Sequence, residues 1–159
     1  MSNLHHLAAQ AVRQALESHL TVATAESLTA GMVSAVLADT PGASGMLQGG
    51  VVAYQNVVKE NVLHVPADLL ARAGSVDPDV ASAMAAGART VLGADVGVAT
   101  TGVAGPDAHD GKPVGTVYIG IATAAGAAGF EYSFTGSRPD IRGGACGAAL
   151  ERLLEALSA

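Results

Sequence analysis

Apolar side chains recur every three or four positions in several stretches of the chain, a spacing typical of helices with one buried face. The longest stretches are residues 3–19, where Asn3 is available as a cap, and residues 139–157. Proline at or just before a helix start predicts two more helices, at residues 67–72 and 78–92. Asp77 is the expected cap of the second of these.

Shorter apolar runs, typical of strands, separate these helices. The expected strands begin at Val22 and cover residues 49–55, 95–101, 114–123 and 129–135. Asn56 is the expected cap of a short helix after the second strand. Strands and helices alternate first, and a hairpin follows. This order predicts an α/β fold, a three-layer α/β/α sandwich on a mixed sheet, with residues 1–159 as a single domain.

The composition is that of a folded globular protein. Half of the 159 residues are apolar, 14% are charged and the mean hydropathy is +0.38, which excludes a disordered chain. No apolar run approaches the roughly 20 residues that a membrane-spanning helix needs, and the first ten residues do not resemble a signal peptide. Since Cys146 is the single cysteine, no disulfide can form within the chain. We therefore expect a cytoplasmic protein with no membrane partner.

The net charge and the content of small residues indicate which binding partners to expect. The formal net charge of −6 argues against a nucleic-acid-binding protein, because phosphate backbones are met by basic patches. Abundant alanine and glycine indicate tightly packed layers with little bulk in each element, so we expect added stability from a homo-oligomer. The five histidines show none of the spacings of metal ligands, and we expect neither a metal nor a cofactor.

The sequence TVATAESLTAG, residues 21–31, joins the first expected strand to a helix-spaced segment that begins at Met32. This pattern places Ser27 at the carboxyl end of a strand, beside a helix start. The N–H groups of a helix start favour negative charge, so Ser27 is a candidate nucleophile with oxyanion-binding N–H groups at residues 27–29. The alternative is that Ser27 or Thr29 only caps the helix, which is the commoner role.

Three turns follow expected strands and have the sequences AESLTAG, YQN and TGVAGP. Ligands of open α/β sheets gather beyond the carboxyl ends of the strands, so these turns are expected to line one pocket. The glycines in residues 101–106 free backbone N–H groups for close approach to a ligand. A simple tight turn is the alternative for this loop.

Lys59 follows the second strand among valines, in a chain with only eight lysine and arginine residues. Partial desolvation there would lower its pKa, and its amine could then deprotonate a serine. The alternative is an exposed lysine paired with Glu60 or Glu26.

Three further side chains are candidates for binding a ligand. Tyr54, at the end of the second strand, can hydrogen-bond a ligand or pack at the sheet edge. Arg138 and Arg142 lie four residues apart at the start of the last helix and suit a phosphate or a carboxylate. For the arginines, the alternative is a solvated helix start with Asp140 between them.

Four blocks in the chain, AESLTAG, GGVVAYQNVVK, TGVAGPDAHDGKPVGTVYIG and FTGSRPDIR, resemble the signature blocks of the CinA C-terminal domain family. Stand-alone members of this family are nicotinamide-nucleotide amidohydrolases. The resemblance spans almost the entire chain and implies a serine/lysine amidohydrolase that converts a small nucleotide, nicotinamide mononucleotide, to nicotinate mononucleotide and ammonia. It implies Ser27 as the nucleophile and Lys59 as the base. The substrate site that it implies comprises Thr29, Gly31, Tyr54, Thr101, Gly102, Ala104, Gly105, Arg138 and Arg142.

The chain departs from the family pattern at two places. Where the family usually has a serine after Ala-Val, before the long helix, this chain has Ser75-Val76-Asp77. Asp77 can cap that helix equally well, but a carboxylate near the pocket would disfavour an anionic ligand. The loop at residues 107–111 lacks the usual glycine pair and is shorter. Two alternatives therefore stay open, a nucleotide-binding module without turnover and an amidase for another carboxamide.

Overall fold

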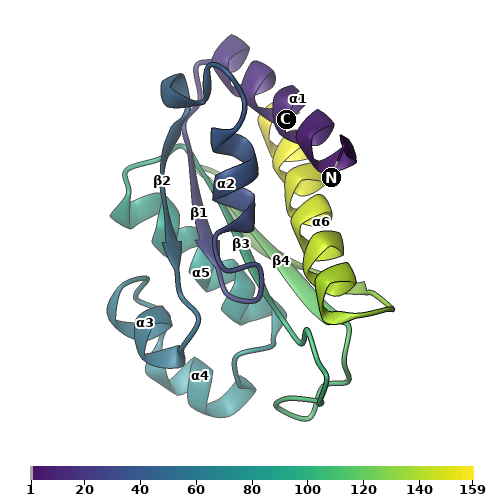
Figure 1. The fold of residues 1–159 in the computed structure, drawn as a ribbon. Helices are drawn as coiled ribbons and strands as arrows, with labels where there is room; N and C mark the ends of the chain where they lie inside the picture. The colour runs from purple at the N-terminus through teal and green to yellow at the C-terminus, as the bar shows by residue number, and fades with distance from the viewer. Residues whose placement is uncertain (1) are drawn as a thin grey trace.

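A five-stranded mixed sheet forms the middle layer of the computed structural model, which describes residues 2–159 (Figure 1). The strands, in chain order, are β1 (Val22–Glu26), β2 (Leu47–Val52), β3 (Val96–Gly102), β4 (Thr116–Thr123) and β5 (Gly126–Ser133). Their order across the sheet is β2-β1-β3-β4-β5. The first three run parallel, and β4 and β5 are antiparallel to their neighbours. The carboxyl ends of β1, β2 and β3 therefore lie at the same edge of the sheet.

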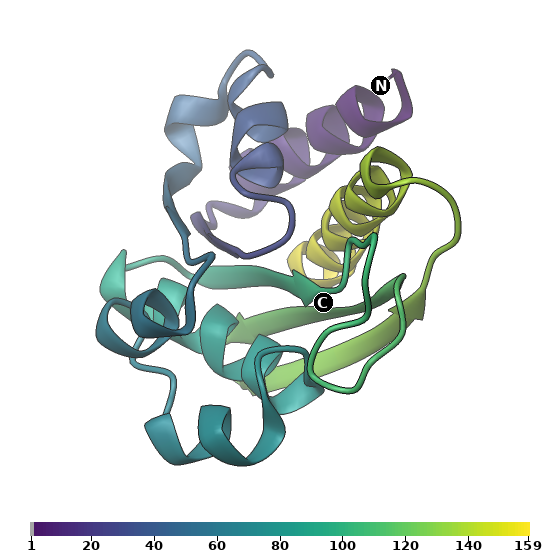
Figure 2. The same cartoon turned by 60° about the horizontal axis from the view of Figure 1, so that its bottom comes forward.

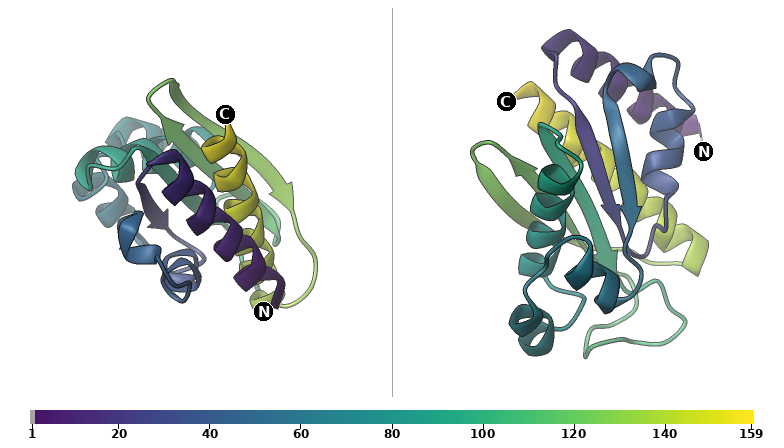
Figure 3. Two further views of the ribbon diagram at one scale, coloured as in Figure 1. Left: turned by 90° about the horizontal axis from the view of Figure 1, so that it is seen from above. Right: turned by 90° about the vertical axis from the view of Figure 1, so that its left-hand side faces the viewer.

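Helices cover both faces of the sheet, so the predicted three-layer sandwich is confirmed (Figure 2). One face carries α1 (Ser2–Ser18), α2 (Met32–Ala38) and α6 (Arg138–Ser158). The other carries α3 (Asn56–Asn61), α4 (Ala67–Ala73) and α5 (Pro78–Val91). Figure 3 shows α1 and α6 side by side over the first of these faces. Across residues 2–159, no helix combines the length and the apolar character that a membrane crossing requires.

The strand residues alternate between two cores of different bulk. Val22 and Ile119 face the side of α1 and α6, whereas Ala23 and Ala99 face α5. On the α5 side the sheet also carries glycines, and a Cβ at Gly97 would collide with the carbonyl oxygen of Ala85 in α5. The small residues thus let the α5 backbone lie directly against the strands, which explains the alanine and glycine content of the chain.

The observed boundaries differ from the expected ones around β2. This strand ends at Val52, because its partner β1 ends at Glu26, the residue that pairs with Val52. Tyr54 therefore lies in the turn after the strand and not within it. The expected cap at Asn56 was wrong, since Asn56 is the first residue of α3 and Gln55 precedes the helix without a side-chain cap.

Candidate active site

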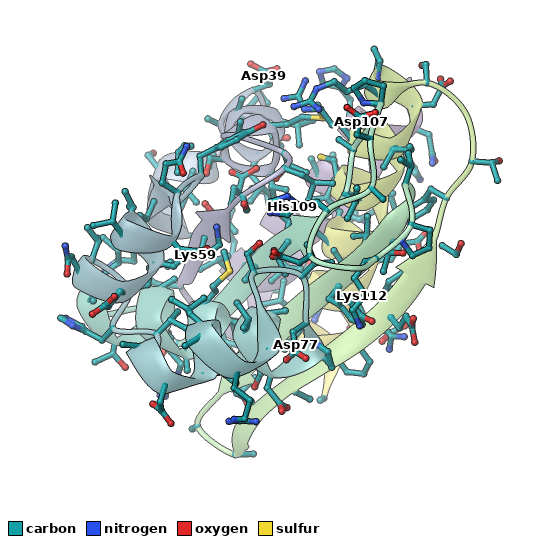
Figure 4. All side chains as sticks on the ribbon, turned by 90° about the horizontal axis from the view of Figure 1, so that it is seen from below. Asp39, Lys59, Asp77, Asp107, His109 and Lys112 are labelled. Carbon is teal, nitrogen blue, oxygen red and sulfur yellow. The ribbon has the colours of Figure 1, made fainter. Side chains whose placement is uncertain are left out.

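A cavity of about 310 Å³ lies at the edge of the sheet where β1 and β3 end. From β1 the chain continues to β2 on one side, and from β2 it crosses over to β3 on the other side of β1, so this is the point at which an open α/β sheet forms a crevice. The cavity is lined by Ser27, Leu28, Tyr54, Ser75, Thr101, Gly102, Val103, Ala104, Gly105, Pro106, Asp107, Ala108, His109 and Arg138. Figure 4 views this edge from below, with Lys59 labelled beside α3 and His109 on the loop after β3.

Ser27 and Lys59 are in direct contact. The Nζ atom of Lys59 lies 3.1 Å from Oγ of Ser27 and donates to it. The same nitrogen donates to the carbonyl oxygens of Ala53, at 2.8 Å, and Tyr54, at 3.1 Å. The structure thus places the two residues within hydrogen-bond reach, as the sequence predicted.

Lys59 is the largest fully buried side chain of the described residues and is only 1% exposed. Burial lowers the pKa of its ammonium from 10.5 to about 8, and the negative charge of Asp110 opposes this decrease. Among residues 2–159, no carboxylate oxygen lies within 4 Å of the ammonium. Lys59 is therefore not the exposed, ion-paired lysine of the alternative interpretation.

The start of α2 is occupied by the carboxylate of Glu26, which the sequence analysis did not identify. Glu26 is fully buried and accepts hydrogen bonds from the N–H of Val33, at 2.8 Å, and the N–H of Ser34, at 3.0 Å. The Ser27 N–H donates to the carbonyl oxygen of Thr100. The prediction that the helix start and the Ser27 N–H bind an oxyanion is therefore wrong. An acidic residue at the end of the strand that leads into a helix was the available signal for Glu26.

Two expected substrate-binding residues, Thr29 and Gly31, do not line the cavity. Thr29 is fully buried, and its Oγ1 lies 2.7 Å from Oε1 of Glu26 and 2.7 Å from Oγ1 of Thr100. Gly31 precedes α2 with a φ of 100°, a conformation that favours glycine. Both residues shape the turn that carries Ser27, so their assignment to the substrate site is corrected.

The two arginines of α6 have different positions. Arg138 lines the cavity and donates to the hydroxyl of Tyr54, at 2.8 Å, and to the carbonyl oxygen of Gly105. Arg142 lies outside it, because its Nε donates to the Leu28 carbonyl oxygen, at 2.8 Å, and its Nη2 to that of Thr29, at 3.1 Å. Arg142 thus stabilises the turn that carries Ser27 from outside the cavity. The prediction that Arg142 contacts the substrate is therefore corrected.

The TGVAGP loop lines the cavity as predicted, from Thr101 to Pro106. The hydroxyl of Thr101 is not available to a ligand, because it donates to the carbonyl oxygen of Ser75 at 2.6 Å. Gly102, Ala104 and Gly105 contribute backbone to the cavity wall. Within residues 2–159, no group of three histidine, cysteine or carboxylate side chains is arranged to hold a metal ion.

The two departures from the family pattern have different consequences. Asp77 does not line the cavity, since its carboxylate caps α5 by accepting from the N–H groups of Asp79 and Val80. It therefore does not support the interpretation as a module without turnover. In the second departure, Asp110 accepts two hydrogen bonds from Ser75, a contact that the sequence analysis missed. Hydrogen bonding within such a loop leaves no periodic signal in the sequence.

Known proteins resemble this chain in sequence and in structure. Residues 4–157 match the CinA C-terminal domain family. A putative competence-damage inducible protein of Desulforamulus reducens is 52% identical over 86% of this chain and 33% of its own length. A CinA-like protein of Geobacter sulfurreducens is 49% identical over 79% of this chain and 31% of its own. The chain thus spans about a third of the length of these curated relatives.

Solved structures give the same result. A competence-damaged protein (CinA) superfamily protein of Klebsiella pneumoniae superposes with a TM-score of 0.93 and 31% identity over 98% of both chains. A competence/damage inducible protein of Agrobacterium tumefaciens gives a TM-score of 0.93 and 32% identity over 99% of this chain and 96% of its own. On the match of residues 4–157 and these likenesses, the chain belongs to the CinA C-terminal domain family.

Proposed function

We propose that this protein is a serine/lysine amidohydrolase that cleaves the carboxamide of nicotinamide mononucleotide and gives nicotinate mononucleotide and ammonia. The observation that carries the proposal is the 3.1 Å contact between the buried Lys59 amine and the Ser27 hydroxyl at the wall of a cavity. An amine that is desolvated beside a serine is a suitable general base.

The hydrogen bonds of Lys59 suit its neutral form. A neutral amine has two N–H bonds and one lone pair. In this form the carbonyl oxygens of Ala53 and Tyr54 can accept the two N–H bonds, and the lone pair can accept from the Ser27 hydroxyl, the reverse of the donation made by the charged amine. The fixed carbonyls therefore orient the amine toward the proton that it is to remove.

The reaction proceeds in two steps. Lys59 takes the Ser27 proton while Oγ attacks the carboxamide carbon, and the resulting ammonium gives its proton to the leaving nitrogen, so that ammonia and an acyl-enzyme form. Water then gives its proton to the neutral Lys59 amine and attacks the acyl carbon. The serine oxygen leaves and recovers its proton from Lys59, which releases the carboxylic acid and restores the dyad.

The negative charge on the attacked oxygen needs hydrogen-bond donors. The N–H groups of Leu28 and Thr29 are the candidates, because neither donates within the described residues while that of Ser27 does. A preorganised donor of this kind contributes about 3 kcal/mol to transition-state stabilisation.

The rest of the cavity suits a phosphorylated substrate. Arg138 provides a positive charge at its mouth, and the backbone of Ala104 and Gly105 forms a wall beside it. The volume of about 310 Å³ lies at the lower end of small-molecule sites, so the substrate would fill the cavity.

The direct test is ammonia release from a panel of amides, with nicotinamide mononucleotide first and free nicotinamide, glutamine and asparagine beside it. The proposal requires turnover of the nucleotide and its loss in Ser27→Ala. Ammonia from another amide alone would show an amidase of different specificity. Tight binding of the nucleotide without ammonia release would show a binding module.

The pH profile provides a second expected result. Lys59 acts in its neutral form, so kcat/KM should rise with pH through the pKa of about 8 and level off above it. At pH 7 about a tenth of the Lys59 side chains would be neutral. Initial rates of ammonia release between pH 6 and 10 would check this rise. A rate that is constant or falling over that range would contradict a lysine base.

Substitutions of the two arginines should change different kinetic constants. Arg138→Ala should raise KM for the nucleotide about tenfold with little change in kcat, because it removes a contact present in ground and transition states alike. Arg142→Ala removes the support of the Leu28 and Thr29 carbonyls and should mainly lower kcat. Steady-state kinetics on both variants would show this split, and unchanged KM in Arg138→Ala would remove that residue from the site.

A further inference from the structure

The loop after β3 folds back on itself at residues 107–112 and forms one side of the cavity. His109 and Lys112 close it by exchanging two backbone hydrogen bonds, with N–O distances of 3.1 and 2.9 Å. Its first half lines the cavity through Asp107, Ala108 and His109. The position of this loop therefore limits the space in the cavity that Ser27 also lines.

Asp110 fastens the 107–112 loop to the segment before α5. Its Oδ2 accepts from the N–H and from the hydroxyl of Ser75, each at 2.8 Å. Gly74 makes the approach possible, since a Cβ there would lie 2.9 Å from the same oxygen. Ser75 is itself held at the end of β3, because its carbonyl oxygen accepts from the Thr101 hydroxyl. A continuous set of hydrogen bonds thus joins the loop to the sheet.

We propose that Asp110 is a positioning residue, which holds the 107–112 loop in place as the outer wall of the cavity and so keeps the substrate opposite Ser27. This inference rests on the proposed amidohydrolase function. Asp110 does not line the cavity and acts through the loop and through Ser75. Its hydrogen bonds are charge-assisted, and they hold the pKa of its carboxyl below the usual value.

The charge of Asp110 also acts on the dyad. Its carboxylate raises the pKa of Lys59 and thereby limits the decrease that burial causes. His109 is the titratable side chain beside Asp110, and its Nε2 lies 3.4 Å from Oδ2. Removal of the Asp110 charge should therefore move the rise of the pH profile to lower pH, whereas mere loosening of the loop should not.

The test compares Asp110→Ala with Asp110→Asn. The asparagine oxygen can still accept both hydrogen bonds from Ser75, but its charge is gone. In Asp110→Ala, hydrogen exchange at the Ser75 amide should become faster, and KM for nicotinamide mononucleotide should rise about tenfold with a smaller change in kcat. Asp110→Asn should keep the Ser75 amide protected and KM near the wild-type value, with the midpoint of kcat/KM shifted to lower pH. Asp107→Ala is the matched control for exchange, because Asp107 has no bond to Ser75.

The possible results distinguish the positioning role of Asp110 from the proposed amidohydrolase function. Unchanged Ser75 exchange and unchanged KM in Asp110→Ala would overturn the inference. Equal losses in Asp110→Ala and Asp110→Asn, with no pH shift, would also overturn it, since the retained hydrogen bonds would then have no effect. If the wild-type protein releases no ammonia, the proposed function fails and the kinetic role of Asp110 fails with it. Hydrogen exchange needs no substrate and still decides whether Asp110 holds the loop.

Discussion

Ser27→Ala is expected to lower kcat for nicotinamide mononucleotide at least about 10⁴-fold, because the variant has no atom that can form the acyl-enzyme. Ser27 is almost completely buried at the cavity wall, and its side chain contacts Lys59. Loss of one oxygen atom should leave the fold and nucleotide binding intact. Ammonia release and calorimetric binding, measured on the same preparation, would check both parts.

The double variant with Lys59→Ala shows whether the two residues form one unit. Residues that act together give losses that do not add, so Ser27→Ala with Lys59→Ala should be hardly less active than Ser27→Ala alone. Thr90→Val is a suitable control, because Thr90 is an exposed hydroxyl residue of α5 that does not line the cavity. Losses that multiply in the double variant would mean that serine and lysine contribute independently, which is incompatible with the proposed dyad.

The layers and the location of the site could be predicted because they depend on local patterns and on one rule of topology. Apolar periodicity and caps such as Asp77 are local properties of the sequence. Ser27 and Lys59 are 32 residues apart, yet they follow neighbouring parallel strands, which are paired up to Glu26 and Val52. Since parallel strands bring their carboxyl ends to one edge, both residues had to lie at that edge.

The direction of individual side chains could not be predicted in the same way. Thr29 lies two residues after Ser27, but its hydroxyl turns inward because the buried Glu26 carboxylate and Thr100 accept it there. Arg142 lies one helical turn after Arg138, and the Leu28 and Thr29 carbonyls hold it outside the cavity. Such partners come together only in the folded chain, and no spacing in the sequence indicates which of them a polar side chain will find.

Lys59→Met and Lys59→Arg are expected to be nearly as inactive as Ser27→Ala. Methionine is of similar length and has no base, and a guanidinium stays protonated at neutral pH and cannot accept the serine proton. Ammonia release would be measured for both variants from pH 7 to 10. Substantial turnover by Lys59→Arg would show that the lysine supplies only positive charge. Another base would then have to activate Ser27, and the mechanism proposed for this site would be wrong.

The Lys59→Met substitution also has a measurable effect on stability. The unfolded chain keeps the Lys59 proton up to a pKa near 10.5, whereas the folded protein releases it at about 8. Between these values the unfolded state binds more protons at Lys59, so the contribution of Lys59 to the free energy of unfolding rises with pH, whereas below pH 8 Lys59 contributes no slope. The difference between 10.5 and about 8 corresponds to about 3 kcal/mol.

Lys59→Met lacks this titration, while every other group that titrates is shared by the two proteins. Its stability relative to the wild-type protein should therefore decrease by about 3 kcal/mol between pH 7 and 10.5. Urea unfolding of both proteins across this range would measure the difference, and Lys112→Met, at a lysine outside the dyad, serves as the control that should show no such trend. A difference that is independent of pH would mean that Lys59 keeps its usual pKa in the folded protein. The lysine would then be protonated at neutral pH, and it could not be the base that Ser27 requires.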